Sequence, residues 1–118
     1  MAKYMILIYG DTQQWAAMTE EQWQAHHTGH GAFMAKAGDR LRDGQQLDQA
    51  TVTTSLRADA DGQVSATEGS FLGAKETLGG YYIVETADLD EALELARLLP
   101  ELNHTHSGLE VRKLAERG

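Results

Sequence analysis

Hydrophobic and polar positions follow two different periods along this chain, and the periods separate strands from helices. Residues 3–9 (KYMILIY) form a short continuous apolar run, which is typical of a strand buried on both faces. Residues 50–58 alternate and are β-branched, and residues 81–86 (YYIVET) are again rich in strand formers. Residues 109–116 (LEVRKLAE) predict a final strand.

Two segments have helical spacing and clear start signals. The first is predicted over about residues 20–37, because Thr19 and Gln22 have the spacing of a capping box and Gly38 provides a stop. The second is predicted over residues 87–100, with Asp88 as the cap and Pro100 as the end. Its buried stripe is expected to comprise Leu89, Ala92, Leu93, Ala96 and Leu99.

The connections complete the predicted order of elements. GDTQQWAA, after the first strand, is expected to be a loop, and residues 39–47 a short strand or turn. A turn at DADG (59–62) joins the strand at 50–58 to a returning strand at 63–69, which predicts a hairpin. Residues 70–80 are expected to form a loop with at most a short turn of helix.

This order, β-α-β, hairpin, β-α-β, predicts an α+β fold. Two split β-α-β units around an inserted hairpin are typical of a ferredoxin-like sandwich, in which two helices cover one face of an antiparallel sheet. We expect a single domain over residues 1–118. The other sheet face would stay partly apolar, and small domains commonly cover such a face by forming a homodimer.

Composition narrows the classes of partner and site. The net charge of −8 disfavours binding to nucleic acid and to anionic membranes, and the single apolar run at the N-terminus is too short to span a bilayer. The absence of cysteine excludes disulfides and thiolate metal sites, which suits a cytoplasmic protein. No binding signature for an organic cofactor is visible, so none is expected.

Three of the five histidines lie in QWQAHHTGHGAF (22–33), and they allow three interpretations. His26, His27 and His30 would share the helix stripe with Trp23, where an imidazole could transfer protons near neutral pH. His26 and His30, one turn apart, could instead bind a metal together with His104 and His106. The third interpretation is purely structural.

Gly29 and Gly31 flank His30 in the same segment. Glycine is a poor helix former, costing roughly 1 kcal/mol relative to alanine in a helix interior. Their presence here indicates either that another part of the chain approaches the helix backbone closely or that the helix is locally frayed.

Several motifs resemble the YCII-related family in its DGPF-type branch. They are KYMILIYGD, HGAF (30–33), EGSFLGAKETLGGYYIVE (68–85), DLDEALELA (88–96) and LEVRKL (109–114), in order along nearly the whole chain. The resemblance implies a dimeric α+β barrel. It also implies a small enzyme doing acid/base chemistry, isomerisation or elimination, on a small aromatic or carbonyl-bearing molecule. The wider family includes a dehydrochlorinase that acts on a chlorinated aromatic.

By the same resemblance, His30 and Glu68 are the site residues, and we expect His30 to be the base and Glu68 the carboxylate that orients it. We further expect His27, Tyr9 and Gln46 to line the ligand site. The chain departs from the family pattern at two places. Asp-Gly-Pro-Phe becomes Glu68-Gly69-Ser70-Phe71, and a Gly-Glu-Gly stretch becomes Gly44-Gln45-Gln46. An alternative function is a non-catalytic ligand-binding or regulatory partner domain, because genes of related proteins often lie beside those of extracytoplasmic-function sigma factors.

Overall fold

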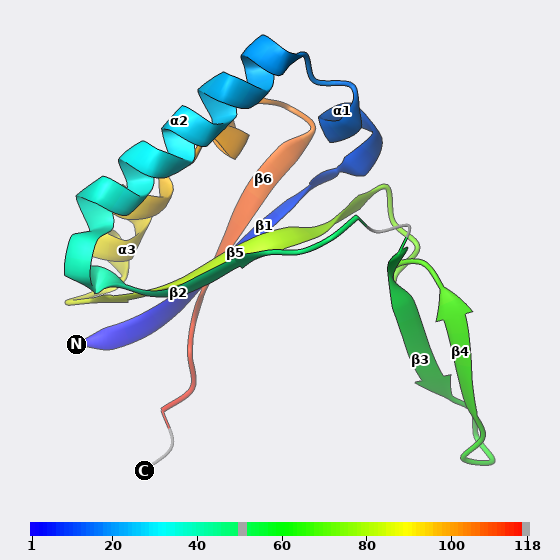
Figure 1. Ribbon diagram of the computed structural model, residues 1–118. Coiled ribbons are helices and arrows are strands. Elements are labelled where there is room, and N and C mark those ends of the chain that lie inside the picture. Colours follow the sequence, from blue (N-terminus) through cyan, green and yellow to red (C-terminus); the bar gives the residue numbers. More distant parts are fainter. Residues whose placement is uncertain (50–51, 117–118) are drawn as a thin grey trace.

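A four-stranded antiparallel sheet with helices on one face forms the body of the molecule (Figure 1). The computed structural model describes residues 1–49 and 52–116. The sheet order β2-β5-β1-β6 confirms the predicted α+β, ferredoxin-like fold. Its strands are β1 (Ala2–Asp11), β2 (Leu41–Gln46), β5 (Glu76–Thr86) and β6 (Ser107–Lys113). The helices are α1 (Thr12–Ala16), α2 (Glu20–Ala37) and α3 (Leu89–Ala96), with 3-10 turns η1 (Gly38–Arg40) and η3 (Pro100–Asn103).

The central strand β1 shows why the helices pack where they do. Tyr4, Ile6 and Ile8 are buried against α2 and α3, whereas the alternate residues Met5 and Leu7 are only half-buried. The prediction of burial on both faces is therefore wrong for the single chain, because nothing in the described residues covers the second face. The core on the helix side comprises Tyr4, Ile6, Ile8, Phe33, Ala37, Val84, Ala92, Leu95, Ala96 and Leu99.

The starts of both long helices agree with the capping signals. The Thr19 hydroxyl accepts a hydrogen bond from the Gln22 N–H (3.1 Å), and the Gln22 side-chain oxygen accepts one from the Thr19 N–H (2.8 Å). Asp88 likewise caps α3 by accepting from the Glu91 N–H at 3.0 Å. Gly38, with φ of 54°, follows the last residue of α2, as its position predicts.

Two connections are more ordered than the sequence predicts. GDTQQWAA contains the short helix α1, because the Asp11 carboxylate accepts from the Gln13 and Gln14 N–H groups and starts it. The loop predicted over 70–80 ends before Glu76, where β5 begins, since this part of β5 pairs with β1 and, at Gly80, also with β2. The glycines of LGG therefore lie within a strand, although glycine usually weakens one.

The second helix is shorter than predicted, which changes what it buries. Helix α3 ends at Ala96, and Pro100 starts the separate turn η3 instead of ending α3. Pro100 lacks an N–H and has a fixed φ, so it suits the first position of a helical turn. The prediction of Leu89 in the core is wrong, since it is 45% exposed, whereas Leu95, absent from the predicted stripe, is 2% exposed.

The predicted hairpin forms a separate two-stranded sheet. Strands β3 (Thr54–Ala58) and β4 (Val64–Glu68) pair with each other and project away from the main sheet (Figure 1). Positions 50 and 51 of the strand predicted at 50–58 lie outside the described residues. Within the described chain, every helix is too short or too polar to cross a membrane.

Candidate functional site

The site begins with two histidines on α2 and one glutamate on η3. His26 and His30 are one helical turn apart, so both rings project from the same side of α2. Glu101 follows Pro100 in η3, which packs on that side. Gly29 allows this approach, because a Cβ at position 29 would lie 2.9 Å from Pro100 Cβ. The first interpretation of this glycine, close approach of another segment, is the one that the structure shows. Gly31 has no such neighbour.

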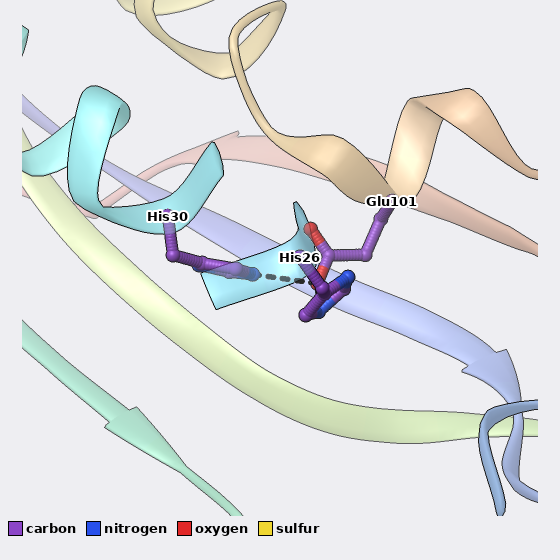
Figure 2. Close-up of side chains that lie close together, drawn as sticks. All are labelled: His26, His30 and Glu101. Atoms are coloured by element: carbon purple, nitrogen blue, oxygen red, sulfur yellow. Dashed lines mark hydrogen bonds and ion pairs between the residues drawn. The ribbon is translucent and has the colours of Figure 1, made fainter. Parts of the chain in front are cut away.

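One oxygen of Glu101 joins the two histidines (Figure 2). Glu101 Oε2 lies 2.8 Å from His30 Nε2 and 3.0 Å from His26 Nε2. Each of these ring nitrogens must carry a proton to donate to an ionised carboxylate. The Glu101 residue is only 3% exposed, so both hydrogen bonds lie in a poorly hydrated environment.

The charge of Glu101 is maintained by this pairing. Burial alone would raise its pKa, but the hydrogen bonds from His26 and His30, together with the charge of His30, lower it to about 2. The carboxylate therefore stays ionised far below neutral pH. It provides a fixed negative charge behind the ring of His30.

Tyr82 of β5 occupies the other side of His30. Its hydroxyl lies 2.7 Å from His30 Nδ1. With the proton of neutral His30 on Nε2, Nδ1 is an acceptor and the Tyr82 hydroxyl is the donor. Burial, and then the negative charge of Glu101, raise the pKa of Tyr82, so its hydroxyl remains protonated. The result is a continuous chain of hydrogen bonds from Tyr82 through His30 to Glu101.

These groups open onto a cavity of about 630 Å³ between α1, α2 and the sheet. Its walls are mostly apolar and aromatic, with Trp15, Trp23, Met34 and Tyr82 among the lining residues. The ring of Trp15 packs on the sheet at Gly10 and Gly79, which have no side chains. A Cβ at Gly10 would come within 2.2 Å of the ring, and a Cβ at Gly79 within 2.6 Å. An apolar cavity with a few convergent polar groups is the usual form of a small-molecule site.

The residues proposed from sequence divide into two groups. His30, His27 and Gln46 line the cavity, and His27 stacks on Trp23 with ring centroids 5.9 Å apart. Tyr9 and Glu68 do not line it. Tyr9 directly follows buried Ile8 on β1 and so faces the opposite side of the sheet.

The single chain does not bring Glu68 to His30. Glu68 is exposed at the end of β4, where it borders a separate hollow together with Asp11 and Lys75. The carboxylate that contacts His30 in the described chain is Glu101 instead. The geometric reason is that β4 belongs to the projecting hairpin, whereas η3 packs on α2.

The donor types of this cluster would also suit a transition metal. One ligand atom each from His26, His30 and Glu101 lies within 4.8 Å of the others. A metal ion bound at Nε2 would need the lone pair of that nitrogen, whereas the hydrogen bond to Glu101 needs a proton there, so these two arrangements exclude each other. His104 and His106 do not join this cluster, and their rings stack on each other at 4.8 Å.

Sequence reasoning missed Glu101 and Tyr82. Glu101 lies in a stretch that reads as a surface loop, and glutamate is rarely buried without a partner, so nothing local marks it. Tyr82 reads in the sequence as a core or interface aromatic. Strand alternation is the signal that could have identified Tyr82 as a site residue. Tyr81 and Tyr82 are consecutive in β5, so their side chains lie on opposite faces of the sheet.

Fold and site together define an α+β protein of the ferredoxin-like class, with a buried histidine–carboxylate pair beside a cavity. The comparisons with known sequences then identify the family: the chain belongs to the YCII-related domain family, whose profile matches residues 2–116. It is also similar to an uncharacterized protein of Rhizobium meliloti (strain 1021). The two are 33% identical over 115 residues, which cover 95% of this chain and 91% of that protein.

Proposed function

We propose that this chain is a small enzyme that transfers protons on a small aromatic or carbonyl-bearing molecule, by isomerisation or elimination. The observation that carries the proposal is the hydrogen bond between His30 Nε2 and buried Glu101 Oε2 at the wall of a cavity. A histidine oriented by a carboxylate is a standard arrangement for general acid/base chemistry. In this proposal His30 holds the proton, and Glu101 has the role that the family resemblance gave to Glu68.

The electrostatics support proton transfer at His30. Because Glu101 stays ionised, an imidazolium at His30 would gain a partner 2.8 Å away without any rearrangement. His26 donates to the same oxygen and helps to hold the carboxylate in place. The pair is therefore arranged before a substrate arrives, which is the condition for efficient catalysis by fixed charges.

The cavity supports the size and type of substrate. A volume of about 630 Å³ lies within the range of small-molecule sites. Trp15 and Trp23 offer flat apolar surfaces, which favour a ring or another planar group. We place the reacting part of the substrate near Tyr82 and His30, and its apolar part against the two tryptophans.

Deuterium incorporation tests this function across several classes of candidate substrate at once. Small aryl ketones, α-keto acids and unsaturated lactones are incubated with the protein in D₂O, and loss of C–H signals is followed by NMR. We expect exchange with at least one class, and a loss of about 10²-fold or more in His30→Gln and Glu101→Gln. His104→Gln serves as the control because His104 lies outside the cavity.

The alternative is a domain that binds a ligand without converting it, including a regulatory partner of an extracytoplasmic-function sigma factor. The same experiment separates the two functions. Ligands that bind in the cavity but show no exchange above the level of the His30→Gln variant would favour the binding function.

We further propose that two copies associate through the uncovered sheet face. Met5, Leu7, Tyr9 and Ile83 are half-buried there and project away from the helices. A contiguous apolar face of this kind is commonly covered by a second copy. The open face lies on the side of the sheet opposite α2 and α3 (Figure 1).

A further inference from the structure

Both ring nitrogens of His30 are already occupied, which leaves a different group to contact the ligand. Nε2 is bonded to Glu101 at 2.8 Å and Nδ1 to the Tyr82 hydroxyl at 2.7 Å. The Tyr82 oxygen, by contrast, has one hydrogen-bond partner in the described chain, and a hydroxyl can take part in up to three hydrogen bonds. Tyr82 lines the cavity, so its remaining capacity is available there.

We propose that Tyr82 is the catalytic residue that touches the ligand, and that the cavity takes ligands with a hydroxyl that becomes negatively charged, namely enols and phenols. This inference rests on the proposed function, in which His30 holds the transferred proton. It adds the group through which the proton travels and the chemical class of the ligand. The Tyr82 hydroxyl would bind the ligand oxygen, while His30 acts from behind it.

The proton balance of this step is simple. The O–H bond of the ligand breaks and its proton goes to the Tyr82 oxygen, while the proton of Tyr82 goes to His30 Nδ1. The ligand is left as an anion that accepts a hydrogen bond from the new Tyr82 O–H. His30 becomes an imidazolium that donates from both nitrogens, to Tyr82 and to Glu101. No oxidant, reductant or second reactant is needed.

The surroundings of His30 suit both states of this step. The titratable groups that contact it are His26 from α2, Tyr82 from β5 and Glu101 from η3. Glu101 compensates the charge that His30 gains, and the anion on the ligand lies beyond Tyr82. Burial and the charge of Glu101 raise the pKa of Tyr82, so it passes on a proton and acts as a donor without persisting as a tyrosinate.

The ring of Tyr82 is held in place by two neighbours. Phe33, which is fully buried, has its ring centroid 4.5 Å from that of Tyr82. On the neighbouring strand β2, a Cβ at Gly44 would come within 2.5 Å of Tyr82 Cδ1. The absence of a side chain at Gly44 therefore makes room for the Tyr82 ring. Such fixed placement is what a group contacting a developing charge requires.

The test uses 4-nitrophenol, whose anion absorbs visible light whereas its neutral form does not. Wild-type protein is added at a pH below the pKa of the probe, where the free probe is almost entirely neutral. We expect the visible band of the anion to appear on binding. Tyr82→Phe keeps the ring but removes the hydroxyl, and it should weaken anion binding about 10- to 100-fold.

Tyr81→Phe is the matched control. Tyr81, the preceding residue of β5, also borders the cavity, but strand alternation directs its side chain to the other face of the sheet, where its hydroxyl donates to Asp43 Oδ2 at 3.2 Å. It should bind the anion like wild type. Gly44→Ala is a second variant: it leaves all three polar groups intact, displaces the Tyr82 ring, and should also weaken the anion band.

The outcomes separate this inference from the proposed function. An anion band that persists in Tyr82→Phe but is lost in His30→Gln would overturn the role of Tyr82 and leave His30 as the proton holder. A band lost in Tyr82→Phe and retained in Tyr81→Phe supports the inference. A wild-type protein that binds the probe only as the neutral phenol, or does not bind it, would overturn the ligand class. Circular dichroism of each variant establishes that it is folded.

Discussion

Replacing Glu101 by glutamine removes one charge from the site with little change in shape. Glutamine offers an acceptor oxygen to His26 and His30, but a neutral one. The pKa of Glu101 falls from 4.5 to about 2 in the folded chain, and each unit of pKa difference corresponds to about 1.4 kcal/mol. The charge of this buried carboxylate is therefore expected to stabilise the folded state by about 3 kcal/mol at neutral pH.

The sign of the pH dependence follows from the lowered pKa. The folded state binds fewer protons at Glu101 than the unfolded state, so its stabilisation is complete above about pH 4.5 and is lost as pH falls toward 2. Glu101→Gln lacks this contribution at every pH. The free energies of unfolding of wild type and variant should therefore differ by about 3 kcal/mol at neutral pH and converge in acid.

Urea unfolding at fixed protein concentration measures this difference. With a slope of about 1–3 kcal/mol per molar urea, the midpoint should fall by roughly 1–3 M at neutral pH. Glu94→Gln is the control, because Glu94 is exposed on α3 and forms no hydrogen bond or ion pair through its side chain within the described residues. A difference between wild type and Glu101→Gln that stays constant from neutral pH to about pH 3 would refute the reasoning.

Three further predictions concern packing and association. Leu7→Lys puts a charge on the uncovered sheet face, and sedimentation should show it as a 12.9 kDa monomer while wild type is a dimer; a monomeric wild type contradicts the proposed homodimer. Gly79→Ala places a Cβ 2.6 Å from the ring of Trp15, so unfolding should become easier by about 1–3 kcal/mol and tryptophan fluorescence should shift; unchanged fluorescence would show that the ring lies elsewhere. Phe33→Ala empties a fully buried position and should cost about 3–5 kcal/mol in thermal or urea unfolding; a loss below about 1 kcal/mol contradicts the core assignment.

Local signals predict the fold well where each has a single physical cause. The capping box of Thr19 and Gln22 marks the start of α2 because it satisfies free N–H groups of the first turn. The prediction fails where distant pairing decides the structure. Residues 76–80 contain two glycines and read as a loop, yet they extend β5 because β1 provides partners along this stretch and β2 joins at Gly80.

The site is predictable only in part, for a similar reason. Helical spacing brings His26 and His30 together, and that relation is visible in the sequence. The contacts of His30 with Tyr82 and Glu101 span 52 and 71 residues of chain, and no local pattern encodes them. The family resemblance indicates the histidine, but the carboxylate in contact with it comes from η3, where the sequence shows only what reads as an ordinary surface glutamate.

Proton positions on His30 test the central claim most directly. Long-range ¹H–¹⁵N correlation NMR of the histidine rings distinguishes Nε2–H from Nδ1–H imidazole and from imidazolium, and His30→Gln assigns the signals. For the neutral form of His30 we expect the proton on Nε2 and the lone pair on Nδ1, and we expect both nitrogens to be protonated when the 4-nitrophenol anion is bound. A neutral ring with its proton on Nδ1, the form that metal ligation at Nε2 requires, would contradict the account, as would a ring unaffected by the bound anion.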